Sequence, residues 1–216
     1  MKKLILIFTF LILSCSTVKL STTESEKLKT EFTEMHKIDQ IAASAKPNGE
    51  FINYPTENWG KFKDSVFTKH KNRIENLLNK YGYLGVNELG KSGTNDFWLF
   101  VQHSDKFPDF QKRVLKAMKK AVKKGNANPN NYAYLMDRVN ANSGEKQLFG
   151  TQVDYRINGQ AKPKNGVVDS LNVNKRRKKY NLDSLKTYLN QMTEMHFEMN
   201  KDYFYKKGIT KPNLYN

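Results

Sequence analysis

Apolar residues recur every three or four positions along five separate stretches of this chain, which restricts it to a mainly helical fold. The stretches are residues 24–44, 56–81, 108–124, 129–140 and 182–203. Several of their ends carry residues typical of helix boundaries: Pro108 suits a first helical turn, while Gly82 and Gly125 follow last turns. We therefore expect five helices whose apolar faces share one core.

Three other segments lack this period. Residues 97–101 are apolar on all sides, which fits either a short buried helix over residues 95–103 or a buried strand. Residues 82–93 hold four glycines and are expected to form a loop. Residues 148–157 read as extended chain before Asn158-Gly159, a strong hairpin signal. The expected fold is a single mainly α domain of five to six helices with one small β-hairpin near residues 147–168.

The first fifteen residues have the pattern of a bacterial lipoprotein signal. Lys2 and Lys3 precede an apolar stretch that is too short, at about 1.5 Å per residue, to cross a bilayer core of roughly 30 Å. Ile12-Leu-Ser-Cys15 resembles a lipobox, whose cysteine is acylated, for example with palmitate; the alternative is an incidental cysteine beside an ordinary signal peptide. The expected organisation is a signal peptide (1–14), a lipidated Cys15 with its tether (15–23), one domain (24–207) and a C-terminal tail (208–216).

Location and charge bear on the partners. Ser16 supplies no inner-membrane retention signal of the Asp type, so we expect a lipid-anchored protein at the periplasmic face of the outer membrane. The formal charge is +16, and loss of Lys2 and Lys3 with the signal peptide leaves +14. Such a surplus often indicates nucleic acid, but none is expected as a partner of an exported lipoprotein. The basic runs, residues 116–124 and 176–179, are either solvated faces or binding surfaces for an anionic polymer.

His103 is the candidate acid/base residue, because a histidine with a pKa of about 6.5 exchanges a proton near neutrality. Asp105 and Asp137 are its candidate partners. Side chains at i and i+2 do not face each other on a helix, so Asp137 is favoured and His103 with Asp137 is the predicted catalytic pair. His36 and Asp39, beside the apolar stripe of the first helix, read as surface residues.

Neighbouring polar residues suit a small polar or anionic ligand such as a peptide, sugar or wall fragment. Arg138 offers a planar donor fork, the glutamines offer paired donors and acceptors, and Gly150 permits close approach of backbone. The predicted ligand-binding residues are Gln102, Asp105, Arg138, Gln147, Gly150, Thr151 and Gln152. No cofactor or metal is expected, since four dispersed histidines have no metal-ligand spacing. The alternative is a non-catalytic interaction protein in which these residues hold the fold.

Three motifs in order resemble the bacterial domain-of-unknown-function family 6624 (DUF6624). They are Gln-His-x-Asp at 102–105, Ala-x-Leu-x-Asp-Arg-Val at 133–139 and Gln-x-Tyr-Gly-Thr-Gln at 147–152, where Phe149 replaces the tyrosine. The similarity covers about residues 25–190 and includes Asp39-Gln40 and Arg176-Arg177, although an arginine frequent after Asp-Gln is missing near Ala42. The resemblance implies a shared polar site and no particular reaction.

Overall fold

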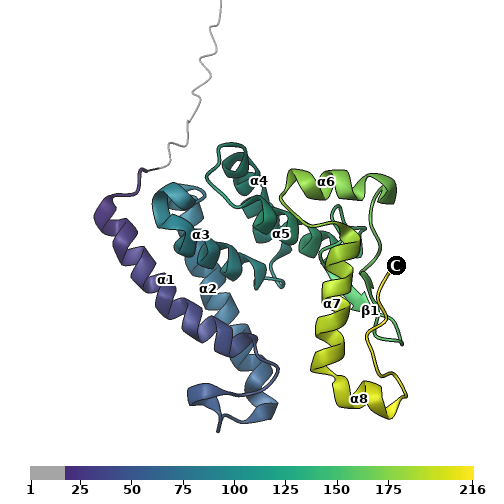
Figure 1. Cartoon of the computed structure of the whole chain (residues 1–216). Helices are drawn as coiled ribbons and strands as arrows, with labels where there is room; N and C mark the ends of the chain where they lie inside the picture. Colours follow the sequence, from purple (N-terminus) through teal and green to yellow (C-terminus); the bar gives the residue numbers. More distant parts are fainter. Residues whose placement is uncertain (1–17) are drawn as a thin grey trace, which may run out of the picture.

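The computed structural model of this chain describes residues 18–216, so the predicted signal peptide and Cys15 lie outside the described residues. The described part holds eight α-helices and one antiparallel two-stranded hairpin, which confirms a mainly α single domain (Figure 1). The elements are α1 (Thr22–Ala43), α2 (Trp59–Tyr81), α3 (Val86–Gln102), α4 (Pro108–Lys123), α5 (Pro129–Asn142), β1 (Val153–Tyr155), β2 (Ala161–Pro163), α6 (Val173–Lys179), α7 (Leu185–Met199) and α8 (Lys201–Lys206).

Helices α1 to α5 enclose one hydrophobic core. Their apolar positions, spaced three or four residues apart, face inward, and Phe32, Ile74, Phe97 and Phe100 are fully buried. The ring of Phe32 meets the edge of Phe100 at a centroid distance of 5.5 Å. This packing fixes α1 against α2 and α3, and therefore fixes the polar side chains that share their inner faces.

The segment expected as a loop over residues 82–93 is instead the start of α3. Glu88 accepts a hydrogen bond from the backbone N–H of Gly85 at 2.8 Å and so caps the helix. Gly90 then adopts φ 70° and ψ −179°, outside the helical region, so α3 consists of two helical segments joined at a kink. The glycines thus permit a kink and a close contact within α3 and do not form a loop. Buried aromatic residues hold the C-terminal part of this helix in the core. The helical alternative for residues 97–101 is the one observed.

The C-terminal part packs as a second layer around the hairpin. Tyr155 pairs with Ala161 across the Asn158-Gly159 turn, as the sequence predicted, although residues 148–152 form a loop instead of strand. Ala161 packs with Tyr188 and Leu189 of α7. The basic run near residue 177, expected at the surface, forms the short helix α6, in which the Arg177 side chain is buried.

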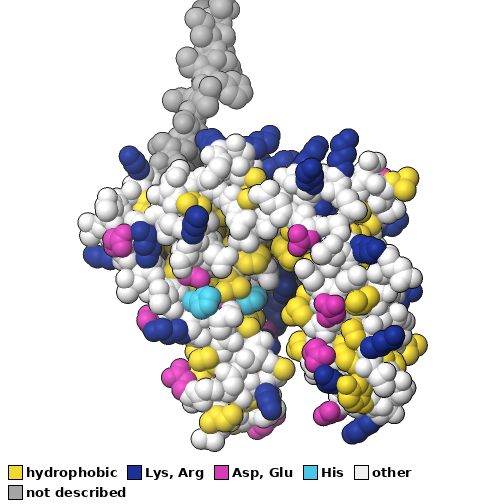
Figure 2. All heavy atoms as spheres, viewed as in Figure 1, with side chains coloured by type: hydrophobic (Ala, Val, Ile, Leu, Met, Phe, Trp, Pro, Cys, Tyr) yellow, Lys and Arg dark blue, Asp and Glu magenta, His cyan; other side chains and the backbone are white. Residues whose placement is uncertain are grey.

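Figure 2 shows a hollow between the half of the molecule that contains α1 and α2 and the half that contains α7 and α8. Histidine side chains lie on the face beside this hollow, and Lys and Arg side chains follow the upper edge. Within residues 18–216, no helix combines the length and apolarity needed to cross a membrane.

Candidate functional site

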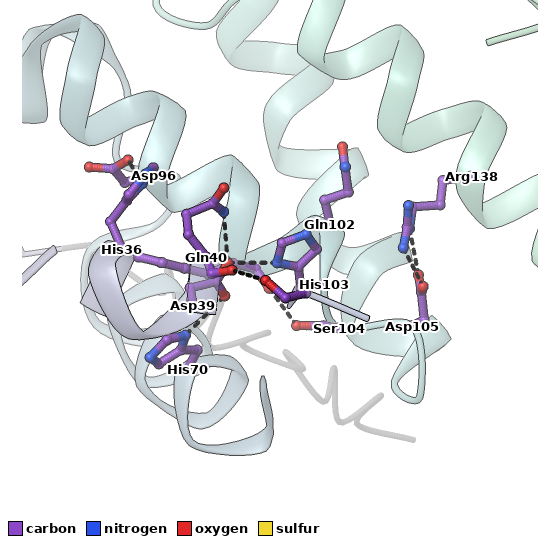
Figure 3. A network of polar contacts seen from close by, with 12 residues as sticks. His36, Asp39, Gln40, His70, Asp96, Gln102, His103, Ser104, Asp105 and Arg138 are labelled. Atoms are coloured by element: carbon purple, nitrogen blue, oxygen red, sulfur yellow. Dashed lines mark hydrogen bonds and ion pairs between the residues drawn. The ribbon is translucent and has the colours of Figure 1, made fainter. Parts of the chain in front are cut away.

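A buried carboxylate joins two histidines from different helices (Figure 3). Asp39 on α1 is fully buried, and its Oδ1 lies 2.7 Å from Nδ1 of His103 at the C-terminal end of α3. Its Oδ2 lies 3.2 Å from Nδ1 of His70 on α2, whose side chain is also buried. Asp39 therefore links α1, α2 and α3 at one point.

The electrostatics of this group favour an ionised Asp39. Burial acts to raise the pKa of Asp39, but the hydrogen bonds from His103 and His70 outweigh it and hold the pKa below its usual value. An ionised carboxylate only accepts hydrogen bonds, so each imidazole donates from Nδ1. In the neutral form of each histidine, Nε2 then keeps its lone pair.

His103 is the member of this group that reaches solvent, with 15% of its side chain exposed. Its ring packs on Phe67 at a centroid distance of 4.8 Å. No side chain in residues 18–216 forms a hydrogen bond with its Nε2. The ring borders a cavity of about 130 Å³, whose lining residues are Asp64, Phe67, Thr68, His103, Asp105, Lys106, Phe107 and Arg138.

Paired charges form the other wall of this cavity. Asp105 accepts hydrogen bonds from Arg138 in a two-pronged pair, at 2.8 Å from Nε and 2.5 Å from Nη2. Asn142 also donates to Asp105, at 3.0 Å. Lys106 and Asp64 form a second ion pair at 2.5 Å. Both positive and negative groups therefore line the cavity, which suits a polar ligand that exchanges hydrogen bonds with both signs.

The predicted pairing of His103 with Asp137 is wrong. The Asp137 carboxylate is buried and accepts hydrogen bonds from the backbone N–H groups of Leu148, Phe149 and Thr151 at 2.8 to 3.2 Å, and from the Thr151 hydroxyl at 3.0 Å. Burial raises the pKa of Asp137, while these hydrogen bonds oppose the rise. Consecutive residues point about 100° apart on a helix, so Arg138 meets Asp105 while its neighbour Asp137 holds the 147–152 loop.

Polar groups of the Gly-Thr-Gln loop form hydrogen bonds with neighbouring protein groups. Gln147 is fully buried, donates to the carbonyls of Gln152 and Lys164, and accepts from the Gln152 N–H. Gly150 has φ +74°, and a Cβ there would lie 2.8 Å from the Leu185 side chain, so glycine is required. No residue of this loop lines the cavity beside His103.

Among the predicted ligand-binding residues, the structure brings Asp105 and Arg138 to the cavity with His103. The side chain of Gln102, although adjacent in sequence, points away from Asp39 in Figure 3. The hydroxyl of Ser104 donates to the carbonyl of Phe100 at 2.7 Å, and the residue is buried and does not line the cavity. The sequence prediction thus merged two separate clusters, of which the first borders the cavity beside His103.

Asp39 and His70 were missed as site residues, and Asp39 was wrongly expected at the surface. A signal was present: Asp39 lies four residues after Met35 and three before Ala42, within the buried stripe of α1. A carboxylate in an apolar stripe requires a buried partner. The other short contact of a histidine with a carboxylate in this region joins His36 to Asp96 at 2.8 Å.

A metal ion has no obvious place in the described part of the chain. No group of three or more His, Cys, Asp or Glu side chains in residues 18–216 is arranged to hold one. The two histidines at Asp39 present the same carboxylate with their Nδ1 atoms, so their Nε2 atoms do not converge on one point.

Comparison with known proteins assigns a family. A family model described as "Family of unknown function (DUF6624)" matches residues 26–199. No curated protein and no solved structure gives a significant match. The matched range begins in α1, ends with α7, and includes both the Asp39 cluster and the loop held by Asp137. Because this range covers more than half of the sequence, the chain belongs to the DUF6624 family.

Proposed function

We propose that this protein is a lipid-anchored protein of the cell envelope that binds a small polar or anionic group beside His103 and acts on it by acid/base catalysis. The observation that carries the proposal is the accessible His103, oriented from behind by the buried Asp39 at 2.7 Å. A histidine whose Nδ1 is held by a carboxylate and whose Nε2 is free resembles the general base of many hydrolases and transferases.

The cavity restricts what is bound. At about 130 Å³ the cavity is smaller than typical small-molecule pockets, which measure roughly 300–1,000 Å³. Such a space admits the terminal group of a ligand, for example a carboxylate, phosphate or acetamido group, while the rest of the ligand stays outside. Arg138 and Lys106 supply donors, and Asp105 and Asp64 supply acceptors, so a peptide, sugar or wall fragment is a suitable substrate class.

Water or a hydroxyl group is the nucleophile in this proposal, because the neighbouring Ser104 is buried and does not line the cavity. Nε2 of His103 takes a proton from water as the water oxygen bonds to the electrophilic carbon or phosphorus of the substrate. The imidazolium then gives this proton to the leaving oxygen or nitrogen as the bond between that atom and the carbon or phosphorus breaks. Asp39 stabilises the imidazolium and keeps the ring in the productive orientation.

The lipid anchor rests on the sequence pattern of residues 1–15, which combines two lysines, a short apolar run and Cys15. Cells that express the full chain should incorporate labelled palmitate, and the Cys15→Ser variant should not. Sucrose-density fractionation should place the protein with the outer membrane. Equal labelling of the variant, or recovery of the unlabelled wild type in the periplasmic fluid, would contradict the anchor.

Binding is tested by NMR titration of residues 18–216 with acetate, phosphate and N-acetylglucosamine. The His103 ring resonances should shift with at least one probe, while those of His196, a histidine on α7 distant from Asp39, stay unchanged. In a hydrolysis screen over cell-envelope peptides, esters and sugars, His103→Gln should lower kcat about 10²- to 10⁴-fold, with His196→Gln as the control. Wild-type rates in His103→Gln would exclude the catalytic role.

The alternative is a non-catalytic protein in which the motifs serve the fold, and the Asp137 network favours it for the second and third motifs. It predicts that His103→Gln changes neither binding nor rate, whatever its effect on the melting temperature. Lost binding or rate in a His103→Gln variant that is still folded supports the catalytic proposal instead.

A further inference from the structure

Several helix ends meet at one end of the molecule. The C-terminal end of α4 reaches the start of α3, where Asn126 accepts a hydrogen bond from the Val86 N–H at 3.1 Å. Tyr132, in the first turn of α5, stacks on Tyr180, which follows α6, at a centroid distance of 5.5 Å. The ends of α4 and α6 therefore lie near one another, as their positions at the top of Figure 1 show.

This end carries exposed lysines on both helices. We call them the basic end; its members are Lys119, Lys120, Lys123, Lys124, Lys175, Lys178 and Lys179. None of them forms an ion pair within residues 18–216, whereas lysines elsewhere, such as Lys106, do. Figure 2 shows Lys and Arg side chains gathered along this upper edge. Unpaired cations concentrated on one face favour an anionic partner.

The chain enters the described domain at the same end. The backbone N–H of Val18 donates to the carbonyl of Lys80, at the C-terminal end of α2, at 3.3 Å. The nearby carboxylates are already engaged: Glu24 accepts from the Tyr81 hydroxyl at 2.8 Å, and Glu88 accepts from the Gly85 N–H. The described part of the chain thus begins beside the basic end.

We propose that the basic end lies against a membrane surface of anionic phospholipids. This orientation of the domain rests on the proposed lipid anchor, because an acylated Cys15 would hold the basic end next to the bilayer. Each lysine close to an anionic surface strengthens binding roughly fivefold. A lipid surface matches the spread of these lysines over two helices better than a single small anion does.

This orientation also places the candidate site. Helix α4 begins at Pro108, directly after Phe107, which lines the His103 cavity, and ends at the basic end. Its 16 residues span about 24 Å at 1.5 Å per residue. The cavity is therefore held away from the lipid surface, where a water-soluble substrate reaches it.

The test uses residues 18–216, which contain the described core from Leu28 to Phe204. Co-sedimentation with vesicles of phosphatidylglycerol and phosphatidylcholine is compared with vesicles of phosphatidylcholine alone. Two variants each remove four positive charges: Lys119, Lys120, Lys123 and Lys124 to Gln in the basic end, and Lys46, Lys61, Lys206 and Lys207 to Gln at exposed positions elsewhere. Circular dichroism verifies that both are folded.

We expect the wild-type domain to bind only the anionic vesicles, with affinity that falls steeply as salt is raised. The basic-end variant should lose at least tenfold in affinity, and the control variant less than twofold. Equal losses in both variants would overturn the proposal, as would the absence of binding to anionic vesicles. Retention on an anionic polysaccharide without vesicle binding would assign the surface to a polymer instead. Because the domain is unlipidated, a negative result leaves the palmitate and His103 experiments unaffected.

Discussion

The carboxylate of Asp39 accepts a hydrogen bond from His103 at 2.7 Å, although 64 residues separate the two in the sequence. The carboxylate is inaccessible to solvent, while part of the imidazole borders a cavity. The same carboxylate accepts from His70, which is buried. One histidine of the pair is therefore positioned to meet a ligand, and the other ties the carboxylate to α2.

Asp39→Asn should lower the free energy of unfolding by roughly 1–3 kcal/mol at neutral pH, because an amide cannot accept both imidazole N–H groups as a carboxylate does. Hydrogen bonds from His103 and His70 outweigh burial and lower the pKa of Asp39, so the folded state favours its ionised form. This contribution is fully present above the unfolded pKa of about 3.9 and is lost as the pH falls through the lower folded pKa.

Urea denaturation at about pH 7 and about pH 3 measures this difference. The gap in stability between wild type and Asp39→Asn should narrow on acidification. Asp154→Asn, at an exposed carboxylate in β1, is the control and should change stability by less than about 0.5 kcal/mol. A gap that is constant with pH would show that the ionisation of Asp39 is not linked to folding.

His70 and His103 should respond differently to substitution. His70→Gln removes a ring that is 3% exposed and packs against Phe100, so we expect a loss of roughly 2–4 kcal/mol. His103→Gln affects a more exposed ring and should lose about 1 kcal/mol. Thermal denaturation of the two variants side by side measures the difference. Equal losses would mean that His103 is as structural as His70, which would weaken its assignment to the site.

The sequence predicted the helices because their apolar stripes are regular, and it predicted the turn at Asn158-Gly159 because that dipeptide favours the turn conformation itself. It did not predict the partner of His103. Asp137 was closer in sequence, but side-chain direction on α5 sends it to the 147–152 loop, and the real partner depends on how α1 crosses α3. The burial of Arg177 was missed for a related reason. A run of basic residues predicts exposure to solvent, whereas the hydrogen-bond partners of Arg177 come from segments that only the tertiary structure brings together.

Asp137→Asn should destabilise the fold strongly. The carboxylate accepts from three backbone N–H groups and from the Thr151 hydroxyl, whereas the asparagine NH₂ would face donors. Hydrogen bonds to a charged group are worth roughly 1.5–3 kcal/mol, so we expect a loss of about 2–4 kcal/mol. At about 2–4 °C per kcal/mol, the melting temperature falls by roughly 4–16 °C. Asp154→Asn again serves as the control, and a change in Asp137→Asn as small as in this control would refute the structural role of Asp137.

Arg177 should tolerate neither lysine nor methionine. Its guanidinium donates to the carbonyls of Phe149 and Asp183, both at 2.6 Å, and lies 5.0 Å from the ring centroid of Tyr188. Burial lowers the pKa of Arg177. Lysine cannot reach both carbonyls from one planar group, and methionine leaves them without a donor.

Both substitutions should therefore lower the free energy of unfolding by roughly 2–4 kcal/mol in urea denaturation. Lys178→Met, at the exposed neighbour on α6, should change it by less than about 0.5 kcal/mol. Wild-type stability in Arg177→Met would show that the two carbonyls find other donors and that the buried guanidinium is not required for the 147–152 loop.

Two glycines with similar φ angles distinguish the cost of backbone strain from the cost of side-chain packing. Gly159 lies at the tip of the hairpin, and Gly144 follows α5. Gly144 and Gly159 have φ of +79° and +80°, so alanine at either position incurs a similar backbone penalty of about 1–2 kcal/mol. A Cβ at Gly159 would lie 2.7 Å from Cζ of Phe204 on α8, whereas nothing lies within 4 Å of a Cβ at Gly144. Gly159→Ala should therefore lower the free energy of unfolding by roughly 1–3 kcal/mol more than Gly144→Ala does.

Hydrogen exchange should show faster exchange of the α8 amides in Gly159→Ala alone, because Phe204 must move to admit the methyl group. Equal stability of the two variants would mean that α8 already shifts freely against the hairpin.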